Sequence, residues 1–262
     1  GAGRVAGKGS MSEDAAEYLY GIHSVAGALE SGTDLAEVRI AKDFHGKRLA
    51  QLEAEAKDRG IRVRRVPRAD LDRRSGGGRH QGVVARVNPV PLLGERDLFE
   101  RVEGHPADPF LLLLDGVTDP RNFGACLRTA DAAGVDAVVV PRDRCAPINA
   151  AARKVASGAA ESVPVAAVPN LGRTMDGLKE RGIFLLGTSD RAEAAWHRVD
   201  GTGPLGWVLG AEGEGMRQLT ARKCDQLVQI PMAGSVTSLN VAVATGVVLF
   251  DSVRQRSLAG AE

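Results

Sequence analysis

The sequence contains no apolar run that approaches the roughly 20 residues needed to cross a bilayer. This absence argues against a membrane-spanning protein. The first residues, "GAGRVAGKGSMSEDAAE", include basic side chains but no apolar stretch after them, so they lack the pattern of a secretory signal peptide. We interpret residues 1–17 as a flexible leader outside the fold.

Cysteine is scarce as well. Cys126, Cys145 and Cys224 stand far apart and form no C-x-x-C pair, and the five histidines form no cluster at metal-ligand spacing. These absences fit a reducing cytoplasm and predict no metal site. We expect each cysteine to be a small buried apolar side chain.

Aromatic residues make up 4% of the chain, so its core must be built from Val, Leu, Ile and Ala. The hydrophobic share of 44% and the charged share of 26% are ordinary for a globular protein and argue against general disorder. A length of 262 residues exceeds the usual size of one domain, which predicts two domains.

The net charge of +1 hides an asymmetry between the two halves of the chain. Residues 18–90 contain fourteen Lys and Arg against nine Asp and Glu, whereas residues 109–262 contain sixteen of each sign. The surplus is densest in "IRVRRVPRADLDRR", which holds Arg62, Arg64, Arg65, Arg68, Arg73 and Arg74. Such a basic patch suits a polyanion, because neutralised phosphates release counterions. A solvated strand and turn is the plain alternative.

The first half of the chain has the pattern of a compact α/β module, residues 18–89. Apolar residues at helical spacing in "EYLYGIHSVAGALESG" predict a helix that ends at Gly32, and "GKRLAQLEAEAKDRG" predicts a second that ends at Gly60. The segments "LAEVRIAK", "IRVRRVP" and "HQGVVARV" predict strands. Residues 90–108 are rich in proline and acidic side chains, which predicts a linker with one short helix.

Residues 109–262 alternate between short apolar strands and helices. "FLLLLD", "VDAVVVP", "SVPVAAV", "IFLLGTS", "GWVLG" and "LVQIPM" predict strands, and "NFGACLRTADAAG", "NAAARKVASGAAE" and "NLGRTMDGLKERG" predict helices between them. Strands that alternate with helices form a parallel sheet covered on both faces. Ligands of such sheets bind beyond the carboxyl ends of the strands.

Three stretches with small or polar residues follow predicted strands of this domain. They are "LDGVTDPRNFGACLRTADAAG", "VLGAEGEGM" and "IPMAGSVTSLN". Alone, "GAEGEG" could be a dinucleotide loop, but its spacing is not G-x-G-x-x-G and it does not follow the first strand of the domain. A nicotinamide-dependent oxidoreductase is therefore a disfavoured alternative.

Together these stretches resemble motifs 1, 2 and 3 of the SpoU/TrmH group of RNA ribose 2′-O-methyltransferases, in the SPOUT class. The resemblance runs from Tyr18 to Ser257 and includes "YGIHSV", "HQG", "KVASGAAESVPV", "GAEGEGMR" and "IPMAGSVTSLNVAVATG". Several long motifs match in order as well as in content. Within the group, the likeness is greatest to the bacterial members that modify a guanosine of 23S rRNA.

The resemblance implies a fold and partners that periodicity does not reveal. It implies an L30e-like N-terminal domain, similar to ribosomal protein L30e, that helps to bind RNA. It also implies a C-terminal parallel-sheet SPOUT domain with a deep trefoil knot, which binds S-adenosylmethionine. A homodimer with the active site near the subunit interface completes the expectation, and the expected partner is 23S rRNA or a ribosomal precursor particle.

The family pattern carries over to eight positions of this chain. The catalytic or RNA-facing set is Asn122, Arg128, Glu212, Ser238 and Asn240, and the cofactor-contacting set is Gly210, Ile230 and Leu239. The stretch "IPMAGSVTSLN" would curl around the cofactor, with Gly234 permitting a tight turn and Ser238 capping the last helix.

Each of these residues also has a purely structural interpretation. Arg128 could pair with Asp131 or Asp115, Asn122 could cap a helix, and Glu212 could bind loop amides. In the family, Arg128 is the proposed activator of the ribose hydroxyl, yet a neutral arginine is scarce because its pKa exceeds about 12. We therefore expect Arg128 to hold the target's phosphate and lower the hydroxyl's pKa, with the proton passing to water or Glu212.

The sequence thus predicts a cytoplasmic, dimeric enzyme that methylates the 2′-hydroxyl of a guanosine in 23S rRNA. By resemblance, that guanosine lies in the P loop of the peptidyl-transferase centre. Alternatives are methylation of tRNA or of another rRNA nucleotide, as in antibiotic-resistance methyltransferases, and a non-catalytic RNA-binding assembly factor. The L30e-like domain disfavours the tRNA alternative, whose members typically lack it.

Overall fold

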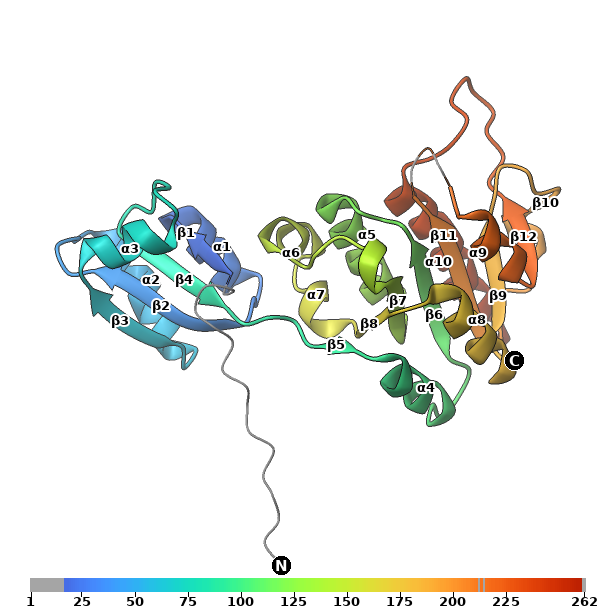
Figure 1. The fold of residues 1–262 in the computed structure, drawn as a ribbon, viewed down its shortest axis with the longest axis horizontal. Helices are drawn as coiled ribbons and strands as arrows, with labels where there is room; N and C mark the ends of the chain where they lie inside the picture. The colour runs from blue at the N-terminus through green and yellow to red at the C-terminus, as the bar shows by residue number, and fades with distance from the viewer. Residues whose placement is uncertain (1–16, 212, 214, 261–262) are drawn as a thin grey trace, which may run out of the picture. The chain divides into compact units, whose positions relative to one another are not determined.

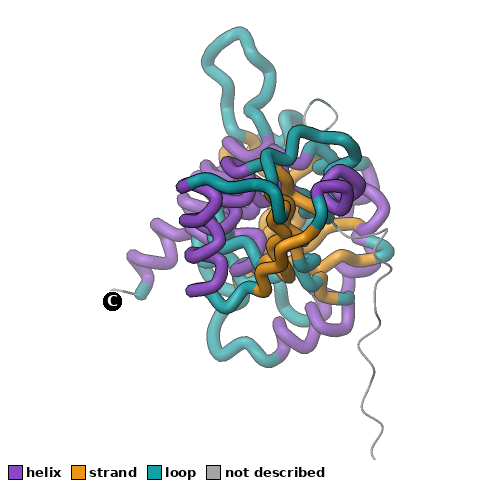
Figure 2. Tube along the Cα trace, turned by 90° about the vertical axis from the view of Figure 1, so that its left-hand side faces the viewer, coloured by secondary structure: helices purple, strands orange, loops and turns teal. Residues whose placement is uncertain are grey.

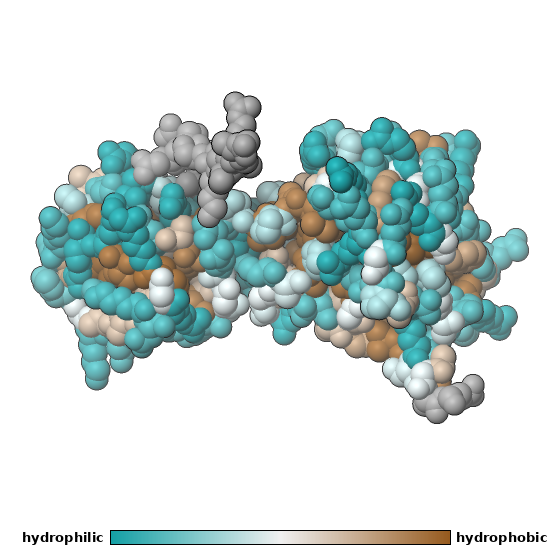
Figure 3. Space-filling view, turned by 90° about the horizontal axis from the view of Figure 1, so that it is seen from below, coloured by the Kyte–Doolittle hydropathy of each residue, from teal (hydrophilic) through white to brown (hydrophobic). Residues whose placement is uncertain are grey.

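The computed structural model describes residues 17–211, 213 and 215–260. Nearly all of the predicted leader, residues 1–17, lies outside the described residues, and so does Glu212. The chain divides into two compact units, Gly1–Pro89 and Val90–Glu262 (Figure 1). On the face that Figure 3 shows, hydrophilic side chains cover most of the surface and apolar ones gather in smaller patches.

The first unit is a four-stranded mixed sheet with helices. Its sheet has the order β1-β4-β2-β3, in which β2 and β3 are parallel and the other pairs are antiparallel. Apolar side chains from α1, α2, β2 and β4 form its main core. The elements are β1 (Tyr18–Tyr20), α1 (Ile22–Glu30), β2 (Leu35–Ala41), α2 (Lys47–Asp58), β3 (Arg62–Val66), α3 (Arg68–Arg74) and β4 (Val83–Val87).

Two elements of this unit differ from the sequence prediction. Residues 18–20 form β1 and not the start of a helix, because they pair with Val84–Arg86 of β4 and because Gly21, at φ 90°, breaks the chain before α1. The short helix α3 was expected to be a turn. Its buried Leu71 packs with Ala41 and Val84, a tertiary contact that no local pattern predicts.

The second unit is built on an eight-stranded, wholly parallel sheet with the order β10-β12-β9-β11-β6-β7-β8-β5. Helices α5 and α10 pack on one face of this sheet and helices α4 and α8 on the other; Figure 2 colours helices purple and strands orange. The elements are β5 (Leu92–Leu93), α4 (Glu95–Glu103), β6 (Phe110–Asp115), α5 (Pro120–Ala132), β7 (Ala137–Pro141), α6 (Ala150–Ala156), α7 (Ala159–Ser162), β8 (Val165–Val168), α8 (Leu171–Glu180), β9 (Phe184–Thr188), β10 (Ala194–Ala195), β11 (Leu205–Gly210), α9 (Gln218–Lys223), β12 (Gln226–Gln229) and α10 (Val241–Ala259).

The burial of strand β6 explains why the central strands have continuous apolar sequences. Leu112 and Leu114 pack in a core with α5 and α10, whereas Leu111 and Leu113 pack in a second core with α4 and α8. Successive side chains of a strand point to opposite faces. Both faces of this strand are therefore buried, as the parallel-sheet prediction requires.

Residues 90–108, expected to be a linker with one short helix, contain that helix as α4 and also the short strand β5. Both pack on the second unit, because β5 pairs with β8 and the α4 side chains of Leu98 and Val102 are buried in its core. Glu95 and Asp97 lie in the first turn of α4, where their negative charges stabilise the positive end of the helix dipole.

The segment "NAAARKVASGAAE" forms two helices and not one. Asn149 caps α6 by accepting a hydrogen bond from the Ala152 N–H, and the helix ends at Ser157, which is left-handed with φ 54°. Gly158, at φ 93°, then redirects the chain into α7. Among the described residues, no helix is long and apolar enough to span a membrane.

Candidate cofactor pocket and active site

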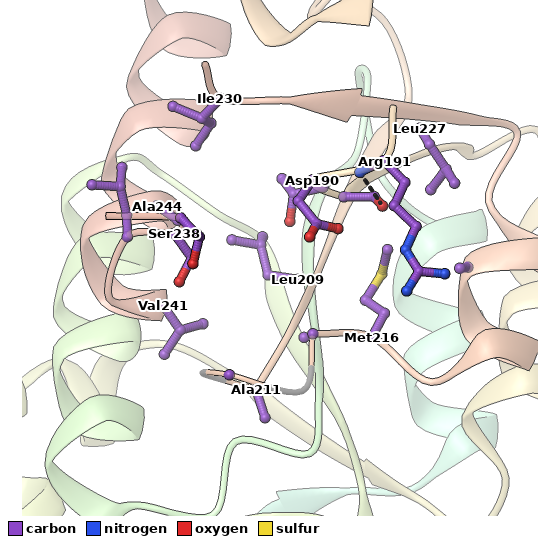
Figure 4. A pocket seen from close by; sticks show the side chains of 18 of the residues that line it. Asp190, Arg191, Leu209, Ala211, Met216, Leu227, Ile230, Ser238, Val241 and Ala244 are labelled. Carbon is purple, nitrogen blue, oxygen red and sulfur yellow. Dashed lines mark hydrogen bonds between the residues drawn. The ribbon is translucent and has the colours of Figure 1, made fainter. Parts of the chain in front are cut away.

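A cavity of about 580 Å³ lies beyond the carboxyl ends of β9, β11 and β12 and beside the start of α10. The end of each strand and the segment after it supply lining residues: Thr188–Arg191 at β9, Leu209–Ala211, Gly213, Gly215 and Met216 at β11, and Ile230, Met232 and Thr237–Leu239 at β12. Figure 4 shows side chains from these segments surrounding the cavity. The position agrees with the rule that open parallel sheets bind ligands at this edge.

The segment after β11 folds back on itself. Ala211 and Gly215 form an isolated antiparallel bridge, and a Cβ at Gly210 would lie 2.1 Å from the Gly215 carbonyl carbon. Gly213 and Gly215 have φ values of 78° and 68°, which side-chain-bearing residues rarely adopt. The glycines of "GAEGEG" are thus required by this tight loop. Gly210, which the family pattern assigns to the cofactor, lines the cavity.

An ion pair between the buried Asp115 and the exposed Arg217 fixes the end of this loop to the neighbouring strand. Asp115, at the end of β6, has no exposed side-chain surface and accepts hydrogen bonds from the Arg217 N–H at 3.0 Å and Nε at 2.8 Å. Burial would raise the pKa of Asp115, but the Arg217 guanidinium, Thr220 and the Arg217 N–H outweigh it and hold that pKa below its usual range. The carboxylate therefore stays charged and holds the loop.

The segment after β9 was not singled out from the sequence. Thr188, Ser189, Asp190 and Arg191 line the cavity, and the Arg191 N–H donates to Ser189 Oγ at 3.2 Å. In Figure 4 the Asp190 carboxylate points into the cavity. The rule on strand carboxyl ends could have found these residues, because "IFLLGTS" was already predicted to be a strand.

The polar stretch between β12 and α10 projects as a long loop (Figure 1). Ile230, Ser238 and Leu239 line the cavity, so three residues of the family pattern meet Gly210 there. The expectation that Gly234 permits a tight turn is wrong. Gly234 has no positive φ, and a Cβ there would meet nothing within 4 Å, so this position does not require glycine.

Asn240, and not Ser238, caps α10. Its Oδ1 accepts hydrogen bonds from the Ala242 N–H at 2.9 Å and the Val243 N–H at 3.4 Å. Its Nδ2 donates to Asn122 Oδ1 at 3.0 Å, which joins motif 3 to motif 1. Since Leu239 and Val241 on either side of Asn240 both line the cavity, this asparagine pair lies next to it.

Asn122 does not cap α5. The cap is Asp119, whose Oδ1 accepts from the Asn122 N–H at 2.8 Å, and Pro120 follows at the first helical position. The cap interpretation of Asn122 is therefore wrong, and its side-chain Oδ1 accepts a hydrogen bond from Asn240 instead.

Arg128 lies on the same helix, about 9 Å further along its axis than Asn122. It is exposed, does not line the cavity, and forms no hydrogen bond or ion pair with any described residue. Both expected salt-bridge partners are engaged elsewhere: Asp131 accepts from Ser162 at 2.7 Å, and Asp115 binds Arg217. The structural interpretation of Arg128 is thus wrong.

The cysteines carry no chemistry in this site. Cys126 is buried, whereas Cys145 and Cys224 are only partly buried, which differs from the expectation for those two. Burial raises the pKa of both partly buried thiols to about 12. The residues that the structure describes contain no group of three or more His, Cys, Asp or Glu that could hold a metal ion.

The cavity lining fits S-adenosylmethionine. Among the described lining residues, Asp190 is the one carboxylate and Arg191 the one cation, and apolar side chains such as Leu209 and Ile230 complete the wall. S-adenosylmethionine carries a carboxylate, an ammonium group, two ribose hydroxyls and a flat adenine. Asp190 would meet the ammonium or the hydroxyls, Arg191 the carboxylate, and the apolar wall the adenine.

A parallel α/β sheet with a nucleoside-sized pocket at its carboxyl edge, and with a polar amide pair beside that pocket, defines a group-transfer enzyme of the α/β class. Residues 109–250 match the SpoU rRNA Methylase family, and residues 18–93 match the RNA 2′-O ribose methyltransferase substrate-binding family. The chain belongs to the SpoU rRNA methylase family.

Similar proteins span nearly the whole chain. The 23S rRNA (guanosine-2′-O-)-methyltransferase RlmB of Escherichia coli is 52% identical over 92% of this chain and 99% of its own, and that of Photobacterium profundum is 50% identical over 95% and 100%. Among solved structures, the SpoU methyltransferase AviRb of Streptomyces viridochromogenes in complex with AdoMet aligns with a TM-score of 0.69 and 25% identity, over 97% of this chain and 95% of that one.

Proposed function

We propose that the protein transfers a methyl group from S-adenosylmethionine to the ribose 2′-hydroxyl of a guanosine in 23S rRNA. The observation that carries the reaction type is the Asn122–Asn240 hydrogen bond, which joins two distant motifs at the side of the candidate cofactor cavity. The substrate is supported by relatives of that activity that are about half identical over more than nine tenths of the chain.

The reaction needs alignment more than acid–base chemistry. S-adenosylmethionine supplies a methyl group on a positively charged sulfur, which leaves as a neutral thioether. The chain must hold the ribose oxygen in line with that methyl group, with the reacting atoms about 3–3.5 Å apart. Asn122 and Asn240 restrain each other's side chains, so they suit the task of holding the ribose beside the cavity.

Arg128 then binds the phosphate of the target nucleotide. Its guanidinium is exposed and forms no ion pair with a described residue, so it can meet an anion without first breaking an internal contact. A cation beside the ribose lowers the pKa of the 2′-hydroxyl, and the proton passes to water or to Glu212, which lies outside the described residues.

Arg128→Lys separates this role from that of a base. Lysine keeps the charge but not the two-pronged geometry. We expect turnover to fall about tenfold while the pH–rate profile keeps its shape, since the charge that perturbs the hydroxyl remains. Near-full turnover with an unshifted profile would exclude an essential two-pronged or base role for Arg128.

The function itself is tested with methyl-labelled S-adenosylmethionine. Unmodified 23S rRNA, tRNA and precursor particles are each incubated with the protein, and labelled nucleosides are identified by mass spectrometry. We expect label in 2′-O-methylguanosine from 23S rRNA or its precursor particle. Label in tRNA would instead support the tRNA alternative, and cofactor binding without label in any RNA would support the assembly factor.

The assembly proposed is a homodimer, as the family resemblance implies. Helix α10 presents Val243, Val247 and Phe250 at spacings of four and three residues, which places them on one side of the helix. Val243 is 53% exposed and Phe250 is 47% exposed. This exposed apolar stripe begins beside the asparagine pair. It can pack against the same stripe of a second copy of the chain, which would bury both.

Three further parts of the proposal complete this picture. The N-terminal unit, residues 18–89, acts as the L30e-like RNA-binding domain, and residues 109–262 act as the methyltransferase domain. The trefoil knot stays a prediction from the resemblance. An enzyme whose substrate is 23S rRNA acts in the cytoplasm.

A further inference from the structure

The N-terminal unit contains a cavity of its own, of about 480 Å³. It is formed by the start of α1, the residues that follow β2, the exposed side of α3 and the glycine-rich loop before β4. The lining residues are Ile22, Phe44, Arg68, Asp72 and Gly77–Gly82. None of these belongs to the S-adenosylmethionine cavity or to the proposed catalytic set.

The glycine-rich loop is held in one conformation by His80, which is 4% exposed. Its Nδ1 accepts a hydrogen bond from the Gly82 N–H at 3.1 Å, so its Nε2 carries the proton and donates to Asp72 Oδ1 at 2.9 Å. Ser75 Oγ donates to the Gly78 carbonyl at 3.2 Å. The "HQG" motif thus begins with a residue whose task is to fix the loop.

Gln81 is held in a strained backbone position with unused donors. Its φ is 49°, a left-handed value that is rare for residues other than glycine and clusters at functional sites. Its Oε1 accepts from the Ile22 N–H at 3.2 Å, which fixes the amide so that the other end is the NH₂ group. That NH₂ group meets no acceptor among the described residues, and Gln81 is one of the residues that line the cavity.

The two arginines of the cavity are unlike their neighbours in the basic segment. Four of those neighbours form ion pairs with carboxylates of the same unit: Arg64 with Glu37, Arg65 with Glu53, and Arg73 and Arg74 with Asp70. In contrast, Arg68 and Arg79 are exposed and form no ion pair or hydrogen bond with a residue that the structure describes. Arg68 and Arg79 thus give the cavity two cations that no described carboxylate pairs with.

Aromatic rings lie directly on the loop. The Phe44 ring covers Gly82 so closely that a Cβ there would lie 2.5 Å from the ring, and the Tyr20 ring covers Gly78 in the same way at 2.6 Å. Phe44 is half-buried and Tyr20 is 41% exposed, so each retains surface for another contact. Exposed rings beside arginines are the usual platform for unpaired RNA bases.

We propose that this cavity binds one unpaired nucleotide of the RNA substrate. Arg68 and Arg79 hold its phosphate, the Phe44 ring stacks on its base, and the Gln81 NH₂ group donates to an oxygen of the base or phosphate. Asp72 has a second carboxylate oxygen that can accept from a base amino group. The inference rests on the proposed function of the chain as an RNA methyltransferase and adds a recognition site remote from the reacting ribose.

The first test is the double variant Arg68→Ala, Arg79→Ala in the full chain. Its matched control is Lys47→Ala, Arg48→Ala, which removes the same charge from exposed positions of the same unit outside the cavity lining. Affinity for a labelled 23S rRNA fragment is measured by fluorescence anisotropy over a salt series. We expect the cavity variant to raise Kd by about tenfold or more and to reduce the salt slope by about one, because both arginines hold one phosphate, and the control to raise Kd less.

Two single variants test the base contact. Phe44→Leu keeps an apolar side chain over Gly82 but removes the ring, and we expect Kd to rise about tenfold. Gln81→Glu keeps an oxygen for the Ile22 N–H but replaces the donor with a charge, and we expect a similar loss. Melting temperature and the Kd for S-adenosylmethionine are measured alongside. We expect that Kd to match wild type in both variants, and Phe44→Leu to lower the melting temperature slightly, because Phe44 also packs against the core.

The outcomes separate this inference from the function on which it rests. If the cavity variants bind RNA as the control does, the nucleotide site is wrong even when wild type methylates RNA normally. If wild type methylates no RNA, the proposed function fails whatever the variants show. Equal losses in the cavity pair and the control pair would mean that diffuse charge, and not this cavity, binds the RNA.

Discussion

At the scale of single residues, Asn240 has two tasks that the sequence does not separate. It caps α10 through Oδ1 and meets Asn122 through Nδ2. The sequence "TSLN" offers Ser238 and Asn240 as caps two residues apart, and the start of a helix is uncertain by that amount from pattern alone. The family pattern found both residues for the site, but the choice of cap required the backbone path.

Asn240→Asp and Asn240→Ala should therefore differ. Asp keeps the cap, because its carboxylate accepts from the same N–H groups, but it cannot donate to Asn122. We expect Asp to lower kcat at least tenfold with little change in the free energy of unfolding, and Ala to lower kcat and also cost about 0.5–2 kcal/mol of stability. Denaturant unfolding and steady-state methylation measure the two effects. Equal kcat values for Asn240→Asp and wild type would show that the hydrogen bond between Asn240 and Asn122 has no role in catalysis.

Asp190 is the residue of the cavity that sequence reasoning missed. Since its carboxylate is the one anionic side chain among the described lining residues, we expect Asp190→Asn to weaken S-adenosylmethionine binding about tenfold, as loss of a charge-assisted hydrogen bond does. Glu193→Gln, three residues on and outside the lining, is the control. Calorimetric titration measures both, and an unchanged Kd for Asp190→Asn would show that this carboxylate does not hold the cofactor.

At the scale of elements, the strands of the second unit were predictable because both faces are buried, which leaves an unmistakable apolar run. Elements that depend on distant partners were not predictable: β1 needs β4, and α3 needs Ala41 and Val84. The break after α6 was not predictable either, because it depends on a left-handed Ser157. The Gly210–Met216 loop was found by its glycines. Its anchor, Asp115, was not, because Arg217 lies about a hundred positions away in the sequence.

This anchor makes part of the stability dependent on pH. Because the folded-state pKa of Asp115 is below its usual 3.8, its stabilising contribution is complete above that value and is lost as the pH falls through the folded-state pKa. We expect Asp115→Asn to cost about 1–3 kcal/mol near pH 7 and to flatten the decline of stability below pH 4.

Fluorescence measures this effect selectively, because both tryptophans, Trp196 and Trp207, lie in the second unit and Trp207 is buried. Denaturant unfolding is followed at several pH values, with the exposed Asp143→Asn as the control. A wild-type acid dependence that survives in Asp115→Asn would assign the effect to other carboxylates.

At the scale of the whole molecule, the sequence predicted the number and kind of layers but not the order of the strands. Strand β11 lies between β9 and β6, and this order brings Gly210, Ile230 and Leu239 to one cavity. Periodicity describes each strand by itself and contains nothing about its neighbours. Only the family resemblance placed these residues together beforehand.

The proposed dimer makes a prediction at this scale. Val243→Glu with Phe250→Glu puts charge into the α10 stripe, and we expect the mass in light scattering to fall from that of two 27.5 kDa chains to that of one. Phe184→Glu, at a comparably exposed apolar position on the amino end of β9, should leave the mass unchanged. A wild-type protein that is monomeric at micromolar concentration would contradict the dimer.

The insertion of β11 between two earlier strands also bears on how the chain is made. Until about residue 210 has left the ribosome, β6 and β9 have no shared neighbour, and each presents an unpaired edge of backbone N–H and C=O groups. Parallel pairing over such long sequence separations is slow. The nascent chain therefore carries β6 with an open edge from about residue 115, and β9 with an open edge from about residue 188, until β11 is made. A translation product cut short before β11 is a candidate for chaperone capture or aggregation.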